Sequence, residues 1–535
     1  MVALQAYGQG RPAEGDGRTL WIRGGMVVDG SGPRRRADVL VADGRVADVV
    51  EGGLAAAPAG AEPLEAEGHL VTPGFCDMHS HDDVACADAA VYEAKVRQGV
   101  TTVAVAMDGL GYAPLPEAHR AALERYWRPV DGEAGDLAAE SLGAYVEALS
   151  GRIGPNVVLG VPHGNVRVAA AGFALRPLDE AALGRAERLA AESASVGVYG
   201  LSTGLGYAPA VAADRRELSR VGRAVAAAGG RRYVTHMRDY GRAIFAALDE
   251  AAAVARDSGL ALHVSHLHLS HPDVLGRGEE LLERLAALAA QGLEVSWDTY
   301  PYGAGSSILY SYLPEWAADG GPDHLLRRLG DDAEVARLEA ATPPPGHGWQ
   351  AVVVASSASG RFVGESVADV ARRLDTTPLR AVARLLVAEE LNVAAIVHQT
   401  LEADDILIAE ADGCVVGSDG LPYGQRRHPR YSGAFAAYYR RHVLDRRALS
   451  AEEAVRRMAV RPAELLGVGT RGPLRGAPAD IAIWLPDGLR DEATFEVPRR
   501  MAQGVRHVLV NGRPVLRDGV FDPDARPGAV LRPGG

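Results

Sequence analysis

The sequence is poor in cysteine and has no long apolar runs. Its 535 residues include only three cysteines, Cys76, Cys86 and Cys414, which are odd in number and far apart. They form neither a disulfide framework nor a paired-cysteine metal site, so a reducing cytoplasm is the expected compartment. No apolar run approaches the roughly 18 residues that a membrane-spanning helix needs, so we expect no membrane partner.

Positive charge is scarce relative to negative charge. The formal net charge of −13 repels phosphate backbones and anionic lipid, so nucleic acid is not expected as a partner. The first twenty residues lack a basic stretch followed by an apolar core, so no secretory signal is expected there. Lys95 is the only lysine among many arginines, and we attribute this to biased codon usage.

Apolar runs alternate with helix-like stretches through the middle of the chain. Eight such runs over residues 73–459 are typical of an α/β fold, a parallel (β/α)8 TIM barrel. Residues 18–72 have the pattern of short strands separated by glycine turns, and residues 460–530 have the same pattern. This predicts a small β-sandwich domain built from both termini. A connection too long for one loop predicts an inserted subdomain at 306–390, before the last strand. The seventh barrel strand is either 293–300 or 392–398.

Polar residues recur where these apolar runs end. His79 and His81 close the first run and, two apart on a strand, point the same way. The later runs end at Asp108, His163, His236, His266 and Asp419. Because the C-terminal ends of barrel strands share one face, these side chains are expected to converge there. Imidazole and carboxylate are ligands of Zn²⁺, with Mn²⁺ or Co²⁺ as alternatives, so the pattern predicts one or two divalent ions.

Such a site is suited to hydrolysis. A divalent ion lowers the pKa of a bound water molecule toward about 7. A nearby carboxylate can take a proton and pass it to a leaving nitrogen, and Asp419 is the predicted acid/base. A single histidine at a strand end is most often structural, but an HxH pair followed by several further strand-end ligands favours a metal site.

These motifs resemble those of the amidohydrolase superfamily and, within it, the D-aminoacylase (N-acyl-D-amino-acid deacylase) family. The resemblance runs from about residue 20 to 525. The matching segments are PGFCDMHSHDD, GVTTVAVAMDG, NVVLGVPHGNVR, GLSTGLGYAP, THMRD, SHLHL, DTYPYGAGSS, and GSDGLP followed by HPR. The resemblance implies a metal-dependent hydrolase that cleaves the amide bond of a small N-acyl amino acid, an N-acyl-D-amino acid in particular.

The resemblance also assigns roles to individual positions. The family's metal ligands match His79, His81, His236, His266 and Asp419, and its catalytic acid/base matches Asp419. The arginine that holds the substrate carboxylate matches Arg430. Substrate-pocket residues match Tyr207, Tyr300 and Ser306, and a GHG-motif histidine matches His163.

Two positions depart from the family pattern. Asp108 stands where the family has a bridging cysteine, so it either bridges two ions or leaves a site for one ion. As a harder ligand than thiolate, it would favour Mn²⁺ or Co²⁺. His268 stands where the family has a lysine that helps to hold the substrate carboxylate, so the pocket loses a fixed charge. An unusual N-acyl amino acid, or an amide without the usual carboxylate, is therefore an alternative substrate.

Two other functions remain open from the sequence. A hydrolase of cyclic amides, similar to hydantoinases and dihydroorotases, is disfavoured because Lys95 precedes the second strand and cannot supply the carboxylated lysine that bridges two metals on strand four. A non-catalytic scaffold is disfavoured by the intact histidines and Asp419, and only the change at Asp108 supports it. The sequence predicts neither the acyl group nor the oligomeric state.

Overall fold

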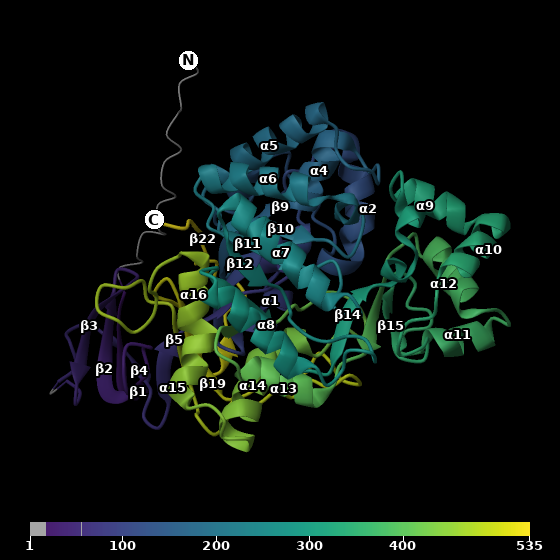
Figure 1. Ribbon diagram of the computed structural model, residues 1–535. Coiled ribbons are helices and arrows are strands. Elements are labelled where there is room, and N and C mark those ends of the chain that lie inside the picture. Colours follow the sequence, from purple (N-terminus) through teal and green to yellow (C-terminus); the bar gives the residue numbers. More distant parts are fainter. Residues whose placement is uncertain (1–17, 55, 535) are drawn as a thin grey trace, which may run out of the picture.

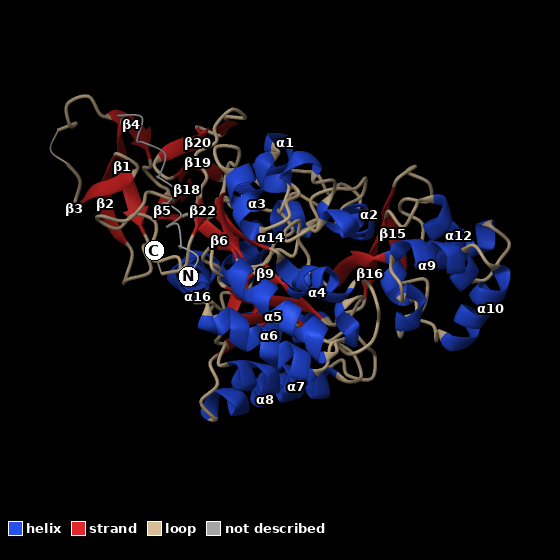
Figure 2. Cartoon of the chain, turned by 90° about the horizontal axis from the view of Figure 1, so that it is seen from above, coloured by secondary structure: helices blue, strands red, loops and turns tan. Residues whose placement is uncertain are grey.

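The chain is arranged as a β-rich part, a central barrel and a helical insertion. The computed structural model describes residues 18–534 except residue 55. Residues 1–17, on which the expectation of no secretory signal mainly rests, lie outside the described residues. The β-rich part lies to the left of the barrel and the insertion to the right, an order that two perpendicular views share (Figures 1 and 2). No helix among the described residues is long and apolar enough to cross a bilayer.

Parallel strands form the central barrel. They are β6 (Phe75–Asp77), β7 (Val100–Val105), β8 (Asn156–Leu159), β9 (Val161–Pro162), β10 (Gly200–Gly204), β11 (Arg232–His236), β12 (Ala261–Val264), β13 (Val295–Thr299) and β17 (Cys414–Val416). Strands β6–β7–β8 pair in one sheet and β9 to β13 with β17 in another, and Gly160 alone separates β8 from β9. Strand β17 returns beside β6, where Met78 N donates to Val416 O at 3.4 Å and Ser80 forms a parallel bridge with Gly420.

Helices on the outside of the barrel bury one face against the strands. They include α1 (Ala89–Val96), α2 (Arg120–Asp131), α3 (Leu142–Leu149), α4 (His163–Ala171), α5 (Glu180–Ala194), α6 (Arg215–Ala227), α7 (Ile244–Ser258), α8 (Gly278–Ala290), α13 (Glu402–Glu410), α14 (Arg430–Tyr439), α15 (Ala451–Val455) and α16 (Arg461–Leu466). Aspartates cap three of them, because Asp88 accepts a hydrogen bond from Ala90 N, Asp179 from Ala182 N and Asp214 from Glu217 N. All six residues of β7 are buried, as expected for a strand covered on both faces.

The two ends of the chain meet in one nine-stranded sheet. Its strands are β1 (Thr19–Val27), β2 (Arg35–Ala42), β3 (Arg45–Glu51), β4 (Glu62–Glu65), β5 (Leu70–Pro73), β18 (Ile481–Trp484), β19 (Val505–Val510), β20 (Arg513–Arg517) and β21 (Val520–Phe521). A bulge between Ile22 and Gly25 lets the first half of β1 pair with β4 and the second half with β5. Bulges of this kind form the corners of sandwiches. The last strand, β22 (Val530–Leu531), pairs instead with β8 of the barrel.

A separate unit is inserted between β13 and β17. It contains β14 (Ala304–Ile308), β15 (Val352–Ser357), β16 (Val393–His398), α9 (Pro322–Leu329), α10 (Asp332–Ala341), α11 (Val367–Arg373) and α12 (Pro378–Ala388). Its three strands form their own antiparallel sheet. Strand β13 pairs with both β12 and β17, so the segment 293–300 supplies the seventh barrel strand and 392–398 does not.

The single lysine is buried beneath the mouth of the barrel. Lys95 on α1 is 1% exposed, and its ammonium lies 2.5 Å from Asp77, 3.3 Å from Asp82 and 2.6 Å from Ser418 Oγ. These contacts tie α1 to the ends of β6 and β17. The cation compensates two buried carboxylates that would otherwise be costly to desolvate.

We expect Lys95→Met to destabilise the protein by about 3–5 kcal/mol, because it leaves buried carboxylates without their cation. Thermal unfolding of the purified variant measures the effect. Arg152→Met is the matched control, since its partner Asp136 is exposed and such surface pairs contribute at most about 1 kcal/mol. Equal shifts in Tm for the two variants would contradict a structural role for Lys95.

Candidate metal centre

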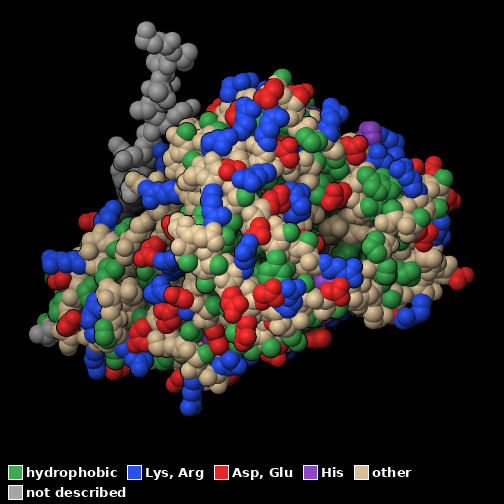
Figure 3. Space-filling view, viewed as in Figure 1, with side chains coloured by type: hydrophobic (Ala, Val, Ile, Leu, Met, Phe, Trp, Pro, Cys, Tyr) green, Lys and Arg blue, Asp and Glu red, His purple; other side chains and the backbone are tan. Residues whose placement is uncertain are grey.

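A cavity of about 950 Å³ opens over the C-terminal ends of the barrel strands. Barrel side chains form its floor, and residues of the inserted unit form part of its wall, including the consecutive prolines Pro343, Pro344 and Pro345. The volume is within the range of small-molecule sites. On the face shown in Figure 3, basic and acidic side chains are interspersed rather than gathered in one patch.

Several cavity-floor residues adopt a backbone conformation that is uncommon outside glycine. The φ angles are 55° at Asp108, 34° at His266 and 47° at Asp419, each two or three residues after the end of a barrel strand. Aspartate and histidine tolerate this left-handed region better than most residues, yet it still costs about 1–3 kcal/mol at each position. Such strain is typical of functional sites, where the backbone must turn a side chain toward a fixed point.

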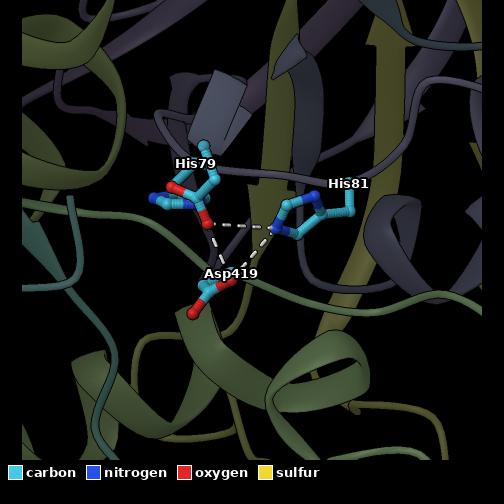
Figure 4. Close-up of side chains that lie close together, drawn as sticks. His79, His81 and Asp419 are labelled. Carbon is cyan, nitrogen blue, oxygen red and sulfur yellow. Dashed lines mark ion pairs between the residues drawn. The ribbon is translucent and has the colours of Figure 1, made fainter. Parts of the chain in front are cut away.

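His79, His81, Asp108 and Asp419 form a first cluster of donor atoms, all within 4.8 Å of one another. Asp419 Oδ1 lies 3.6 Å from His79 Nε2 and 3.3 Å from His81 Nε2 (Figure 4). Asp108 Oδ1 lies 3.6 Å from His79 Nε2. Donors about 2.0–2.2 Å from a tetrahedral ion lie about 3.3–3.6 Å apart, so these atoms fit one such ion.

A second cluster contains Asp108, His236 and His266. Asp108 Oδ2 lies 3.8 Å from His236 Nδ1 and 3.7 Å from His266 Nε2. The two histidine nitrogens are 2.9 Å apart, a separation that either a proton or a shared cation can bridge. Asp108 therefore belongs to both clusters and offers a different oxygen to His79 than to His236.

The electrostatics of the first cluster favour a cation. Burial opposes the charged form of His81, but hydrogen bonds with Asp131 and Asp419 raise its pKa to about 10. The pKa of His79 is also raised, because Asp108, Asp298 and Asp419 outweigh its burial. Four buried carboxylates, Asp108, Asp131, Asp298 and Asp419, surround these two histidines and outnumber them. A divalent cation supplies the missing positive charge, and the buried unpartnered atoms His79 Nε2 and Asp108 Oδ1 fit it as ligands.

Two buried carboxylates hold the outer nitrogens of the HxH pair. Asp131, at the end of α2, places Oδ1 3.2 Å from His81 Nδ1. Asp298, at the end of β13, places Oδ1 3.4 Å from His79 Nδ1 and its other oxygen 2.9 Å from His263 Nε2. Carboxylates behind metal-ligating histidines fix the ring orientation and raise the basicity of the ligand. Sequence reasoning missed both residues, although Asp298 carries the same strand-end signal as Asp419.

Close glycine packing fixes the turn that carries Asp108. Gly109 N donates to Ser202 Oγ at 3.1 Å, and Tyr207 donates to the carbonyl of Asp108 at 3.1 Å. A Cβ atom at Gly204 would clash with that same carbonyl oxygen. The position of Asp108 is therefore set by its neighbours rather than by the turn alone.

Four of the residues expected to bind substrate line the cavity: Tyr207, Tyr300, Ser306 and His268. Burial lowers the pKa of His268 to about 3. Its Nδ1 lies 2.5 Å from the carbonyl of His266, so Nδ1 donates to that oxygen, and the lowered pKa favours the neutral ring. The ring stacks on Tyr240 at a centroid distance of 4.8 Å. The expectation that His268 brings no fixed charge agrees with this environment.

The other two residues expected to bind substrate, Arg430 and His163, lie outside the cavity lining. Arg430 is fully buried beneath it, with Nη2 2.9 Å from Asp419 Oδ2 and its guanidinium 4.4 Å from the Tyr300 ring centroid. His163 begins α4, and its Nε2 lies 3.0 Å from Glu217 on α6. The contact between His163 and Glu217 joins α4 to α6. The sequence motif did not predict this structural role for His163.

A parallel barrel with histidines and aspartates converging at its strand ends defines a class of metal-dependent barrel hydrolases. The chain belongs to the amidohydrolase family, whose model matches residues 64–516. It is 35% identical to N-acyl-D-glutamate deacylase and 33% identical to D-aminoacylase, both from Alcaligenes xylosoxydans xylosoxydans. The first alignment covers 96% of each chain, and the second 94% of this chain and 95% of the relative.

A solved structure shows the same architecture. The N-acyl-D-glutamate deacylase from Bordetella Bronchiseptica, complexed with zinc and a phosphonate inhibitor that mimics the tetrahedral intermediate, superposes with a TM-score of 0.81. Sequence identity is 32%, with 96% of this chain and 99% of that chain covered. These values confirm the predicted family and the predicted barrel fold.

We expect the purified protein to retain at least one divalent ion per chain, because the first cluster offers four converging donors. Elemental analysis of protein prepared without chelator measures the content, and added Zn²⁺, Mn²⁺ or Co²⁺ should raise the Tm of chelator-treated protein. Less than a tenth of an equivalent, with no change in Tm on metal addition, would contradict a metal centre.

Proposed function

We propose that this protein is a metal-dependent deacylase that hydrolyses the amide bond of N-acyl amino acids, and of N-acyl-D-amino acids in particular. The observation that carries the proposal is the convergence of His79, His81, Asp108 and Asp419 on the floor of a cavity sized for a small molecule. The deacylase activities named for its relatives support the substrate class. The free, buried cysteines Cys76, Cys86 and Cys414 favour a cytoplasmic location.

A divalent ion held by His79, His81, Asp108 and Asp419, Zn²⁺ by the donor set, would polarise the amide carbonyl and make a water molecule more acidic. Asp419 supplies the proton transfer. Its Oδ1 faces the HxH pair, so the carboxylate can accept a proton from the attacking water and deliver it to the leaving nitrogen. Ionisation of Asp419 is favoured, because Arg430 and the surrounding histidines outweigh burial and lower its pKa.

Arg430 is suited to orienting a substrate that bears a carboxylate. Its Nε and Nη1 are buried without a hydrogen-bond partner among the described residues, while Nη2 lies 2.9 Å from Asp419 Oδ2. A planar guanidinium can grip a carboxylate through two parallel hydrogen bonds. Because the pKa of His268 is lowered, we assign this purpose to Arg430, whose Nη2 lies 2.9 Å from Asp419.

A cyclic-amide hydrolase is less consistent with the site. The lysine that would have to carry a bridging carboxylate is absent from the metal cluster, since Lys95 is engaged by Asp77 and Ser418 beneath the barrel mouth. Asp108 instead lies between the two groups of histidines.

We expect Asp419→Asn to lower kcat for an N-acyl-D-amino acid by about 10²–10⁴-fold, because an amide side chain cannot carry a proton between water and the leaving group. Steady-state kinetics measure the loss, and elemental analysis of the same preparation tests whether the metal is still bound. Activity within threefold of the parent would remove Asp419 from the mechanism.

Arg430→Lys should weaken recognition of the carboxylate, because an ammonium is a point charge without the paired donors of a guanidinium. We expect kcat/KM to fall about 10- to 100-fold more for an N-acyl amino acid than for the matching uncharged amide. Comparing the two substrates on one enzyme cancels any shared effect of the lost Asp419 contact. Equal losses on both substrates would show that Arg430 does not read the carboxylate.

A further inference from the structure

Both arginines that line the cavity already face carboxylates of the protein. They are Arg238 and Arg242, at the ends of the barrel strands. Four of the five N–H groups of Arg238 donate to Glu250 and to two backbone carbonyls, at 2.6–2.9 Å. Arg242 donates from Nε to Asp273 at 2.6 Å, and both of these side chains are exposed. The charge of each arginine is therefore compensated before a ligand arrives.

Carboxylates outnumber these arginines on the same side of the cavity. Asp239 and Asp273 belong to the lining, and Glu250 lies behind Arg238. Asp239 accepts hydrogen bonds from the backbone of Gly241 and Ala243, and it forms no salt bridge within the part of the chain that the structure describes. Three carboxylates thus accompany two arginines, so this side of the cavity repels a further negative charge.

The two lining histidines outside the donor clusters do not change this balance. Burial lowers the pKa of His268 to about 3. His271 Nδ1 accepts a hydrogen bond from Asp273 N at 3.2 Å, so that nitrogen carries no proton, as in a neutral ring. Arg430, beneath the floor, is the cation that the proposed function assigns to the α-carboxylate of the substrate.

The opposite wall of the cavity, from the inserted unit, is uncharged. Among the described residues, the segment 304–399 contributes no lysine, arginine, aspartate or glutamate to the lining. Its apolar members are Ile308, Tyr312, Val397 and the three consecutive prolines. A neutral side chain gains free energy on moving from water to such a wall, whereas an ionised carboxylate loses its hydration there without gaining a partner.

We propose that this cavity selects N-acyl amino acids with an uncharged side chain and rejects those with an acidic side chain. The inference rests on the proposed function and narrows its substrate class. A glutamate or aspartate derivative carries two carboxylates, and only the α-carboxylate finds a cation, at Arg430. One relative is an N-acyl-D-glutamate deacylase, so overall identity alone would favour the opposite specificity. Unpaired charge against one substrate is a common source of such selectivity.

An isosteric pair of substrates tests the selection. N-acetyl-D-glutamine and N-acetyl-D-glutamate have nearly the same shape and differ in the charge of the side chain. We expect kcat/KM of the metal-loaded enzyme to be at least about tenfold higher for the glutamine compound, because the second carboxylate is desolvated without a cation. A smaller ratio, or a preference for the glutamate compound, would overturn the inference.

Releasing one arginine at the cavity mouth should weaken the selection. Asp273→Asn leaves the charge of Arg242 uncompensated, so we expect the ratio of the two kcat/KM values to fall about 2- to 5-fold, through faster turnover of the glutamate compound. Asp249→Asn is the matched control, because it removes the same charge from an exposed pair with Arg284 on the outer helices α7 and α8. It should leave the ratio unchanged. Equal effects of the two variants, or none from Asp273→Asn, would contradict the role of the charges at the mouth.

Failure of the proposed function would give a different result. If neither compound is hydrolysed, the proposed function fails, and calorimetric titration of the metal-loaded protein with the same two compounds then tests the cavity alone. Binding of N-acetyl-D-glutamine at least about tenfold more tightly than N-acetyl-D-glutamate would support the inference. Similar affinities, tighter binding of the glutamate compound, or no binding of either would overturn it.

Discussion

Buried negative charge without enough positive charge is the constraint on which the site depends. Asp108, Asp131, Asp298 and Asp419 are each 6% exposed or less and lie around the same histidines. Desolvating that many carboxylates is unfavourable unless cations neutralise them. Protonated histidines are one answer, as the raised pKa of His81 indicates, and a divalent ion is a better one, because it leaves the imidazoles neutral and able to coordinate.

The same constraint recurs one layer below, where the protein meets it with a side chain of its own. Lys95 neutralises Asp77 and Asp82 close to the C-terminal ends of the strands that precede the HxH pair and Asp419. The backbone that presents the ligands is therefore held by a permanent internal cation. The lone lysine, which composition alone attributes to codon usage, thus makes three buried contacts through a single compact ammonium group.

The sequence predicted the histidines and aspartates of the donor clusters, but not Asp131 and Asp298, which contact the outer nitrogens of His81 and His79. The HxH pair, His236, His266 and Asp419 are readable because strand ends in a parallel barrel share one face. The placement of β13 could not be read, because 293–300 and 392–398 are both short apolar runs, and only pairing with β12 and β17 separates them. Asp131 lies on a helix that is distant in sequence from its partner His81, so no local pattern reports the contact.

The proline-lined wall of the cavity has a consequence for how this site can change. Pro343, Pro344 and Pro345 come from the inserted unit, while the donors come from the barrel. Consecutive prolines have fixed φ angles and adopt an extended, preformed backbone, so this wall keeps its shape when a ligand leaves. Shape selection and chemistry are thus carried by different segments of one chain. Residues of the insertion can be exchanged over evolution to admit another acyl group, while the strand ends that perform the hydrolysis stay untouched.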